Sequence, residues 1–249
     1  STDEFADELV ATSMAAARAL AAAAARLPAL RRLDLGPFAR SPQRAKALFG
    51  AAWLQLEELR FEVFDMDAAR KVCAALAAAW RNLPRLRSLW MHSEDGAILI
   101  AVPRAFAAAG WRLEKLTIHS TIDDAGISAL AAAPAFALRE LRLLTGELTA
   151  AGLRALGAAP WPLEKLFFQG QAAEYVDDEY GPAFAALAQH KGLRELDLLD
   201  MCLLATNMKA LFDAAWPALT RLSLSEGGLW GQWEEPLALD DASLARAPK

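Results

Sequence analysis

A six-residue pattern, L-x-x-L-x-Φ with Φ an apolar residue, recurs eight times along this chain and constrains its fold more than any other feature. Successive copies begin 26, 30, 27, 25, 25, 30 and 26 residues apart. Self-similarity with a period of about 20 to 50 residues is typical of solenoids and other repeat architectures. The copies read LRRLDL, LEELRF, LRSLWM, LEKLTI, LRELRL, LEKLFF, LRELDL and LTRLSL, and they begin at Leu30, Leu56, Leu86, Leu113, Leu138, Leu163, Leu193 and Leu219.

Alanine-rich stretches with helical spacing, such as TAAGLRALGAA from Thr149 to Ala159, separate the copies. Each unit therefore predicts a short strand, a loop and a helix. This unit resembles the ribonuclease-inhibitor-like class of leucine-rich repeats, from about Leu27 to Leu229. The resemblance implies an α/β leucine-rich-repeat solenoid (horseshoe) with about eight parallel strands on the concave face and helices on the convex face. Solenoids need capped ends, so we expect an N-terminal capping helix (1–27), the repeat array (28–225) and a C-terminal cap and tail (226–249).

The side chains of a strand alternate between its two faces. We expect positions one, four and six of each copy to point inward, and positions five and seven to point outward from the concave face. The second position alternates in charge, and neighbouring opposite charges favour a parallel in-register sheet, so we interpret this row as a structural charge ladder. That row holds Arg31, Glu57, Arg87, Glu114, Arg139, Glu164, Arg194 and Thr220.

Aromatic and basic residues gather at the outward positions of the middle copies. Exposed aromatic rings beside arginine are typical of protein-binding surfaces, so this region is the predicted docking site. The alternative is that long loops or the caps fold over these side chains. The candidate partner-binding residues are Arg60, Trp90, His92, His119, Arg142, Leu144, Phe167 and Gln169.

An acidic insertion, EYVDDEY, is a secondary candidate because it combines negative charge with two tyrosines. It would belong to an acidic rim that selects a basic partner. The alternative is structural, since carboxylates near helix N-termini stabilise the helix dipole. Its candidate residues are Glu174, Tyr175, Asp177, Asp178, Glu179 and Tyr180.

The formal net charge is -5, which gives no electrostatic footprint for nucleic acid or anionic lipid. No uncharged apolar stretch approaches the roughly 18 residues that span a bilayer. We therefore expect another protein as partner, no nucleic acid and no membrane insertion.

Cys73 and Cys202 lie five repeats apart, or about 24 Å at about 4.8 Å per strand. This separation is beyond the roughly 7 Å reach of a disulfide. Two free thiols favour a reducing, cytoplasmic location.

The sequence contains no G-x-S-x-G, phosphate-binding glycine loop or G-x-G-x-x-G motif, so we expect no catalysis and no cofactor. His92 and His119 share one position in adjacent copies and should lie close together. Without a placed carboxylate they make a weak metal site, and no metal is expected.

The preferred function is a non-catalytic protein-interaction scaffold that binds a macromolecular partner through its concave face. The alternatives are a structural subunit of a larger assembly and a GTPase-activating protein resembling the Ran activator.

Two further registers support the alignment. Large aromatic residues precede most strands and are expected to wedge the helix-to-strand turns: Trp53, Trp111, Phe136, Trp161 and Trp216. Gly126, Gly152 and Asn207 occupy one place at the helix entry. Because glycine and asparagine tolerate positive φ, we interpret this place as a shared demand of the backbone.

Overall fold

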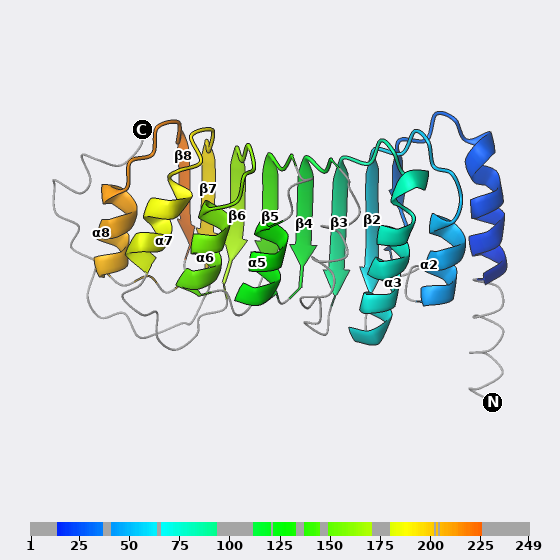
Figure 1. The fold of residues 1–249 in the computed structure, drawn as a ribbon, viewed down its shortest axis with the longest axis horizontal. Coiled ribbons are helices and arrows are strands. Elements are labelled where there is room, and N and C mark those ends of the chain that lie inside the picture. The colour runs from blue at the N-terminus through cyan, green and yellow to red at the C-terminus, as the bar shows by residue number, and fades with distance from the viewer. Residues whose placement is uncertain are drawn as a thin grey trace.

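The computed structural model describes residues 14–36, 41–63, 66–93, 112–120, 122–132, 137–144, 149–170, 180–201, 203 and 205–225. Within these ranges the eight predicted strands form one open parallel sheet in chain order (Figure 1). They are β1 (Arg32–Asp34), β2 (Glu58–Val63), β3 (Ser88–Ser93), β4 (Lys115–His119), β5 (Glu140–Leu144), β6 (Lys165–Gln169), β7 (Glu195–Leu199) and β8 (Arg221–Ser225).

The register of the sheet follows the repeat alignment. The fourth-position leucines pair with one another across neighbouring strands, for example Leu116 with Leu141 and Leu141 with Leu166. A slip of one residue would exchange the two faces of a strand. The observed register therefore also determines which side chains point inward and which point outward. The predicted parallel sheet and its register are confirmed.

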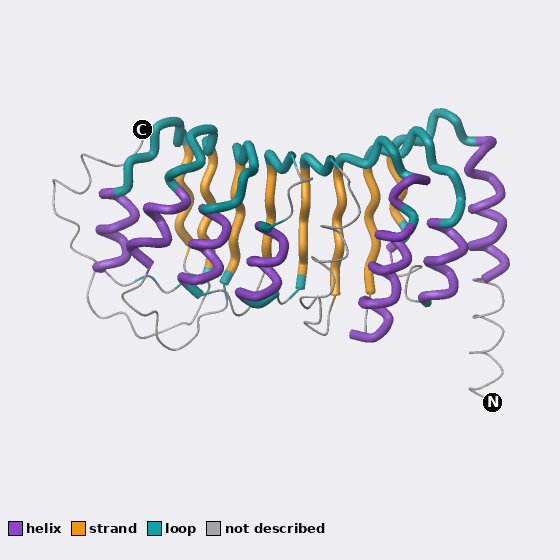
Figure 2. Tube along the Cα trace, viewed as in Figure 1, coloured by secondary structure: helices purple, strands orange, loops and turns teal. Residues whose placement is uncertain are grey.

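Helices alternate with the strands and stand in one row beside the sheet (Figure 1). In Figure 2 the loops that lead into the strands run along one edge of the sheet. Residues 14–23 are helical and continue into the 3-10 turn η1 (Ala24–Arg26); residues 1–13 and 226–249, which belong to the expected caps, lie outside the described ranges. The other helical elements are α2 (Pro42–Phe49), α3 (Met66–Ala78), η3 (Trp80–Asn82), α5 (Asp124–Ala131), α6 (Ala150–Gly157), α7 (Tyr180–Leu187) and α8 (Ala205–Asp213).

Local signals explain where several helices begin. Pro42 occupies the first turn of α2, where its fixed φ is favourable and its missing N–H costs nothing. The Asp123 carboxylate accepts a hydrogen bond from the Gly126 amide at 2.7 Å and caps α5. The Thr149 hydroxyl accepts one from the Ala151 amide at 3.1 Å and caps α6. Such caps satisfy amides that the helix itself leaves unpaired.

The core lies between the sheet and the helices. From the second copy to the seventh, positions one, four and six are buried, and Leu89, Leu116 and Leu141 have no exposed surface. The predicted aromatic wedges are confirmed where they are described. Trp53 is buried and its Nε1 donates to the Leu48 carbonyl oxygen at 2.7 Å, and the Trp216 Nε1 donates to Leu211 in the same way at 2.8 Å. Trp161 is buried, and Trp111 and Phe136 lie outside the described residues.

The predicted backbone demand at the helix entry is wrong. Among the described residues only Gly36 and Asp200 have positive φ, so Gly126, Gly152 and Asn207 do not. The surroundings of two of these residues are described by other contacts. A methyl group on Gly126 would lie 2.8 Å from Ile122 Cγ1, and the Gly152 amide donates to Asp124 Oδ1 at 3.1 Å. An added methyl group on Gly126 would therefore force the Ile122 side chain, which lies just before the same helix, to move.

Candidate binding surface on the sheet

Positions two and three of the repeats form a charged margin where the strands begin. Arg87 Nη1 lies 2.8 Å from Glu114 Oε1, and Arg31 pairs with Glu57 and Arg139 with Glu164 in the same way. The third position pairs likewise: Arg32 with Glu58 at 2.5 Å, Lys115 with Glu140 at 2.9 Å and Lys165 with Glu195 at 2.6 Å. The charged margin therefore neutralises itself between strands, and each exposed pair contributes about 0 to 1 kcal/mol.

Trp90 is the largest side chain on the outward face, where it is half-buried in β3. Its register partner in β2 is Arg60, whose guanidinium carbon lies 4.7 Å from the centre of the Trp90 ring. A guanidinium within about 6 Å of an indole face is attracted by the ring quadrupole. Asp34 in β1 stands 3.8 Å from the Arg60 Nε on the other side. Arg60 is thereby held between the two neighbouring strands.

His92 and His119 lie beside Trp90 and complete what we call the aromatic cluster, Trp90, His92 and His119. The two histidines are register partners in β3 and β4, and their Nδ1 atoms are 3.0 Å apart. Their ring centres are separated by 4.9 Å with 24° between the planes, and the Trp90 ring stacks on His92 at 5.9 Å. Burial and the neighbouring charge of His92 lower the pKa of His119 below its ordinary value.

Arg142 anchors the other half of the outward face. Its Nε donates to Glu140 Oε1 at 2.7 Å, and its guanidinium carbon lies 5.6 Å from the centre of the Phe167 ring on β6. Glu140 also pairs with Lys115 on β4. Burial alone would raise the pKa of Glu140, but hydrogen bonds from Lys115 and Arg142 outweigh it and lower the pKa. The charged Glu140 therefore fixes the position of Arg142.

The eight predicted partner-binding residues all occupy positions five and seven of β2 to β6, so the sheet brings them together on one face. Leu144 and Gln169 complete the set, and the Gln169 side-chain amide donates to Asp200 Oδ2 at 2.7 Å. One position departs from the expected alternation. Thr117 belongs to the fifth position but is only 5% exposed, because its short side chain lies in register between Trp90 and Arg142.

The acidic insertion is described only at its end. Glu174, Tyr175, Asp177, Asp178 and Glu179 lie outside the described residues. Tyr180 is the first residue of α7 and is 7% exposed, with its ring centre 6.1 Å from that of Phe184. The Tyr180 side chain therefore packs into the core and offers little surface to a partner.

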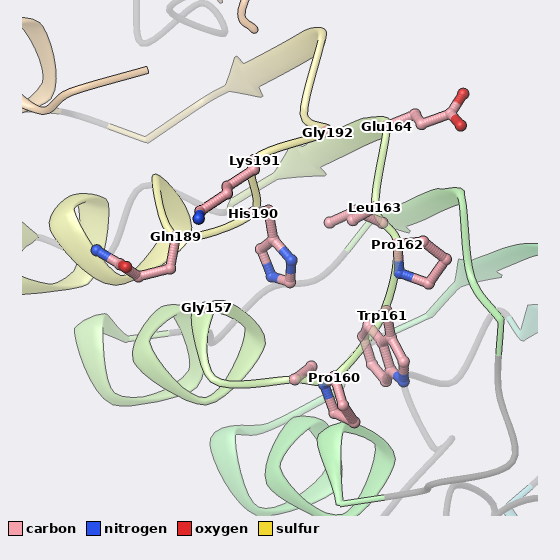
Figure 3. Close-up of a pocket in the computed structure, with 11 residues that line it drawn as sticks. Gly157, Pro160, Trp161, Pro162, Leu163, Glu164, Gln189, His190, Lys191 and Gly192 are labelled. Atoms are coloured by element: carbon pink, nitrogen blue, oxygen red, sulfur yellow. The ribbon is translucent and has the colours of Figure 1, made fainter. Parts of the chain in front are cut away.

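Sequence reasoning did not anticipate a hollow of about 460 Å³ between the loops that lead into β6 and β7 (Figure 3). Pro160, Trp161 and Pro162 line one side, and His190 with Lys191 lines the other. The imidazole of His190 is buried and its Nε2 lies 2.8 Å from the Leu156 carbonyl oxygen. His190 thus ties the end of α6 to the next repeat, and no periodic signal in the sequence marks that contact.

Within the part of the chain that the structure describes, no three His, Cys, Asp or Glu side chains are placed to hold a metal ion. None of the helices described there is long and apolar enough to cross a membrane. No protein-family model and no curated protein matches this chain. The architecture itself is that of repeated strand and helix units in one parallel sheet.

Proposed function

We propose that this chain is a leucine-rich-repeat protein of the ribonuclease-inhibitor-like class. We further propose that it binds a protein partner on the concave face of a horseshoe and catalyses no reaction itself. The family assignment is supported by the agreement between the eight L-x-x-L-x-Φ copies and eight in-register strands. In a horseshoe of this class, positions five and seven line the concave face.

One observation carries the proposed binding surface: two arginine–aromatic pairs lie on the same face of the sheet, one across β2 and β3 and the other across β5 and β6, with β4 between them. Arg60 lies over Trp90, and Arg142 lies over Phe167. Trp90 and Phe167 are half-buried, whereas the inward leucines of the same strands are about fully buried. Large aromatic and arginine side chains dominate the energetics of protein interfaces, and this face presents both kinds together.

The contacts among these side chains also favour binding. Arg60 is held by Trp90 and Asp34, and Arg142 by Phe167 and Glu140. Side chains that are already ordered lose less conformational entropy when a partner docks. The charges of the charged margin are paired between strands, so the two arginines and their aromatic rings are the distinctive feature of the face. A partner that fits this face would present apolar groups to the rings and a carboxylate near Arg142.

The test is quantitative affinity purification from the native source with mass spectrometry. It compares the wild-type chain with a Trp90→Ala/Phe167→Ala variant. A matched control, Lys209→Ala, changes an exposed residue of α8 away from the sheet. We expect specific partners to be lost from the double variant and kept by the control, while thermal melting shows both variants folded.

Partners retained by the double variant would overturn the proposed surface and would direct attention to the acidic insertion. A large fall in the thermal midpoint of the double variant would mean that the two rings act as packing residues. GTP hydrolysis by a captured GTPase, accelerated by the wild-type chain, would favour an activator instead of a scaffold.

A further inference from the structure

The histidine pair has a geometry that protein packing alone does not require. His92 and His119 are held by adjacent strands in register, and their Nδ1 atoms face one another at 3.0 Å. Both residues are half-buried on the outward face, so part of the pair stays exposed to solvent. Two imidazole nitrogens at this separation share one proton in a hydrogen bond.

The same separation fits two ligands of one metal ion. Zinc binds histidine nitrogen at about 2.0 to 2.1 Å. Two such nitrogens then lie about 2.9 Å apart for a right-angled pair and about 3.4 Å apart for a tetrahedral pair. The observed 3.0 Å lies within this interval. A metal ion could therefore take the place of the shared proton with little movement of the backbone.

A carboxylate stands beside the pair. Glu62 is the register partner of His92 on β2, so the seventh position of three consecutive strands reads Glu62, His92 and His119. Glu62 is half-buried and makes no ion pair with any residue that the structure describes. This is the placed carboxylate that the sequence analysis did not identify. As the side chains stand, the three do not converge on a point, so Glu62 would have to change rotamer to join the two imidazoles.

We propose that His92 and His119 chelate a divalent transition-metal ion of the zinc type through their Nδ1 atoms, with Glu62 as the third protein ligand and water in the remaining positions. The ring that carries its proton on Nδ1 shifts to the Nε2-protonated form, which frees both Nδ1 lone pairs for the metal. Imidazole ligands favour Zn²⁺, Cu²⁺ and Ni²⁺, whereas Mg²⁺ and Ca²⁺ prefer sites made of oxygen. This site goes beyond the proposed scaffold function and needs no partner protein.

The experiment titrates Zn²⁺ into the full, tag-free, chelator-treated chain by calorimetry, with Mg²⁺ as the control metal. One equivalent of Zn²⁺ and no Mg²⁺ is expected to bind. Loss of a group that merely orients a ligand weakens metal binding by about 10- to 100-fold, so His92→Ala and His119→Ala should each weaken Zn²⁺ binding by at least about ten-fold. Glu62→Gln should weaken it less, and Lys209→Ala, an exposed residue of α8 away from the sheet, should leave it unchanged.

Nitrogen chemical shifts of the imidazole rings provide a second readout that needs no variant. The chain holds three histidines, and the third, His190, is buried against Leu156 and serves as an internal reference. On adding Zn²⁺, the Nδ1 signals of His92 and His119 should move and those of His190 should stay. Zinc binding that survives the double variant His92→Ala/His119→Ala, or unchanged shifts at millimolar Zn²⁺, would overturn the proposal and leave the pair as a proton-sharing contact.

Discussion

Gly157, the last residue of α6, lies against the backbone of Ala186 in α7. A methyl group on Gly157 would stand 2.4 Å from the Ala186 carbonyl carbon and 2.6 Å from the Leu187 amide nitrogen. Both obstacles are backbone atoms, which cannot swing aside as a flexible side chain can. The spacing between these two consecutive helices is therefore set by a residue without a side chain.

Gly157→Ala should destabilise the protein. Glycine is usually about 0.5 to 1 kcal/mol worse than alanine inside a helix, so propensity alone predicts a gain. Overpacking a tight contact typically costs about 1 to 3 kcal/mol, and the backbone clash should reverse the sign. The measurement is the free energy of unfolding in urea. Gly192→Ala is the matched control, since its nearest neighbour would be the Leu163 carbonyl oxygen at 3.4 Å and its φ is not positive. Equal effects of the two substitutions would contradict this account.

Leu141→Ala should lower the free energy of unfolding by about 2 to 5 kcal/mol, the usual range for a buried leucine. Leu141 has no exposed surface at the centre of β5. Leu144→Ala, on the same strand but in the outward row, removes the same atoms from a half-buried position and should cost less. If the two variants melt alike, the assignment of inward and outward positions is wrong.

The fold could be predicted because the repeat fixes strand, face and register together. Each copy places leucine at positions one and four, and a parallel sheet that pairs Leu116, Leu141 and Leu166 is the arrangement that buries every copy alike. The helix entry was misread for a physical reason. Glycine occurs both where the backbone has positive φ and where there is little space for a side chain. The sequence around Gly126 does not distinguish these two cases.

The outward surface was predictable as a set of positions, but its contacts were not. Alternation along the strand places Trp90 and Arg60 on one face, yet the 4.7 Å cation–aromatic contact depends on rotamers. Thr117 was expected to be exposed and is buried, because side-chain length in the neighbouring strands decides its exposure. The hollow beside His190 arises from two loops of neighbouring repeats, and such a contact leaves no periodic mark in either loop.

Cys73 should resist alkylation in the native protein. It is a free thiol with no exposed surface in α3, and burial raises its pKa to about 12. The thiolate is the reactive form, so at neutral pH iodoacetamide should label Cys73 only after denaturation, without any reductant. Mass spectrometry of the peptide that contains Cys73, before and after guanidinium, checks this. Rapid labelling of the folded chain would show that α3 opens, and a requirement for reductant would indicate a disulfide.

Glu140 should make stability depend on pH in acid. Its folded pKa lies below the ordinary value of 4.5 because the hydrogen bonds from Lys115 and Arg142 outweigh the effect of burial. A carboxyl group with a lowered pKa stabilises the folded state above its unfolded pKa, and that contribution is lost as the pH falls through the folded pKa. Glu140→Gln removes the charge at every pH while keeping the shape of the side chain.

The wild-type chain should therefore exceed Glu140→Gln in free energy of unfolding by about 1 kcal/mol at neutral pH, the upper end for partly exposed pairs. The gap should close as the pH falls below 4.5 and through the lowered folded pKa of Glu140, where the wild-type carboxyl becomes neutral like the amide. Urea unfolding of both proteins at several pH values measures the gap directly. At 1 M salt the Debye length shrinks to about 3 Å, so the neutral-pH gap should narrow there too. A gap that stays constant with pH would mean that Glu140 acts through packing, and a gap that widens in acid would reverse the direction of its pKa shift.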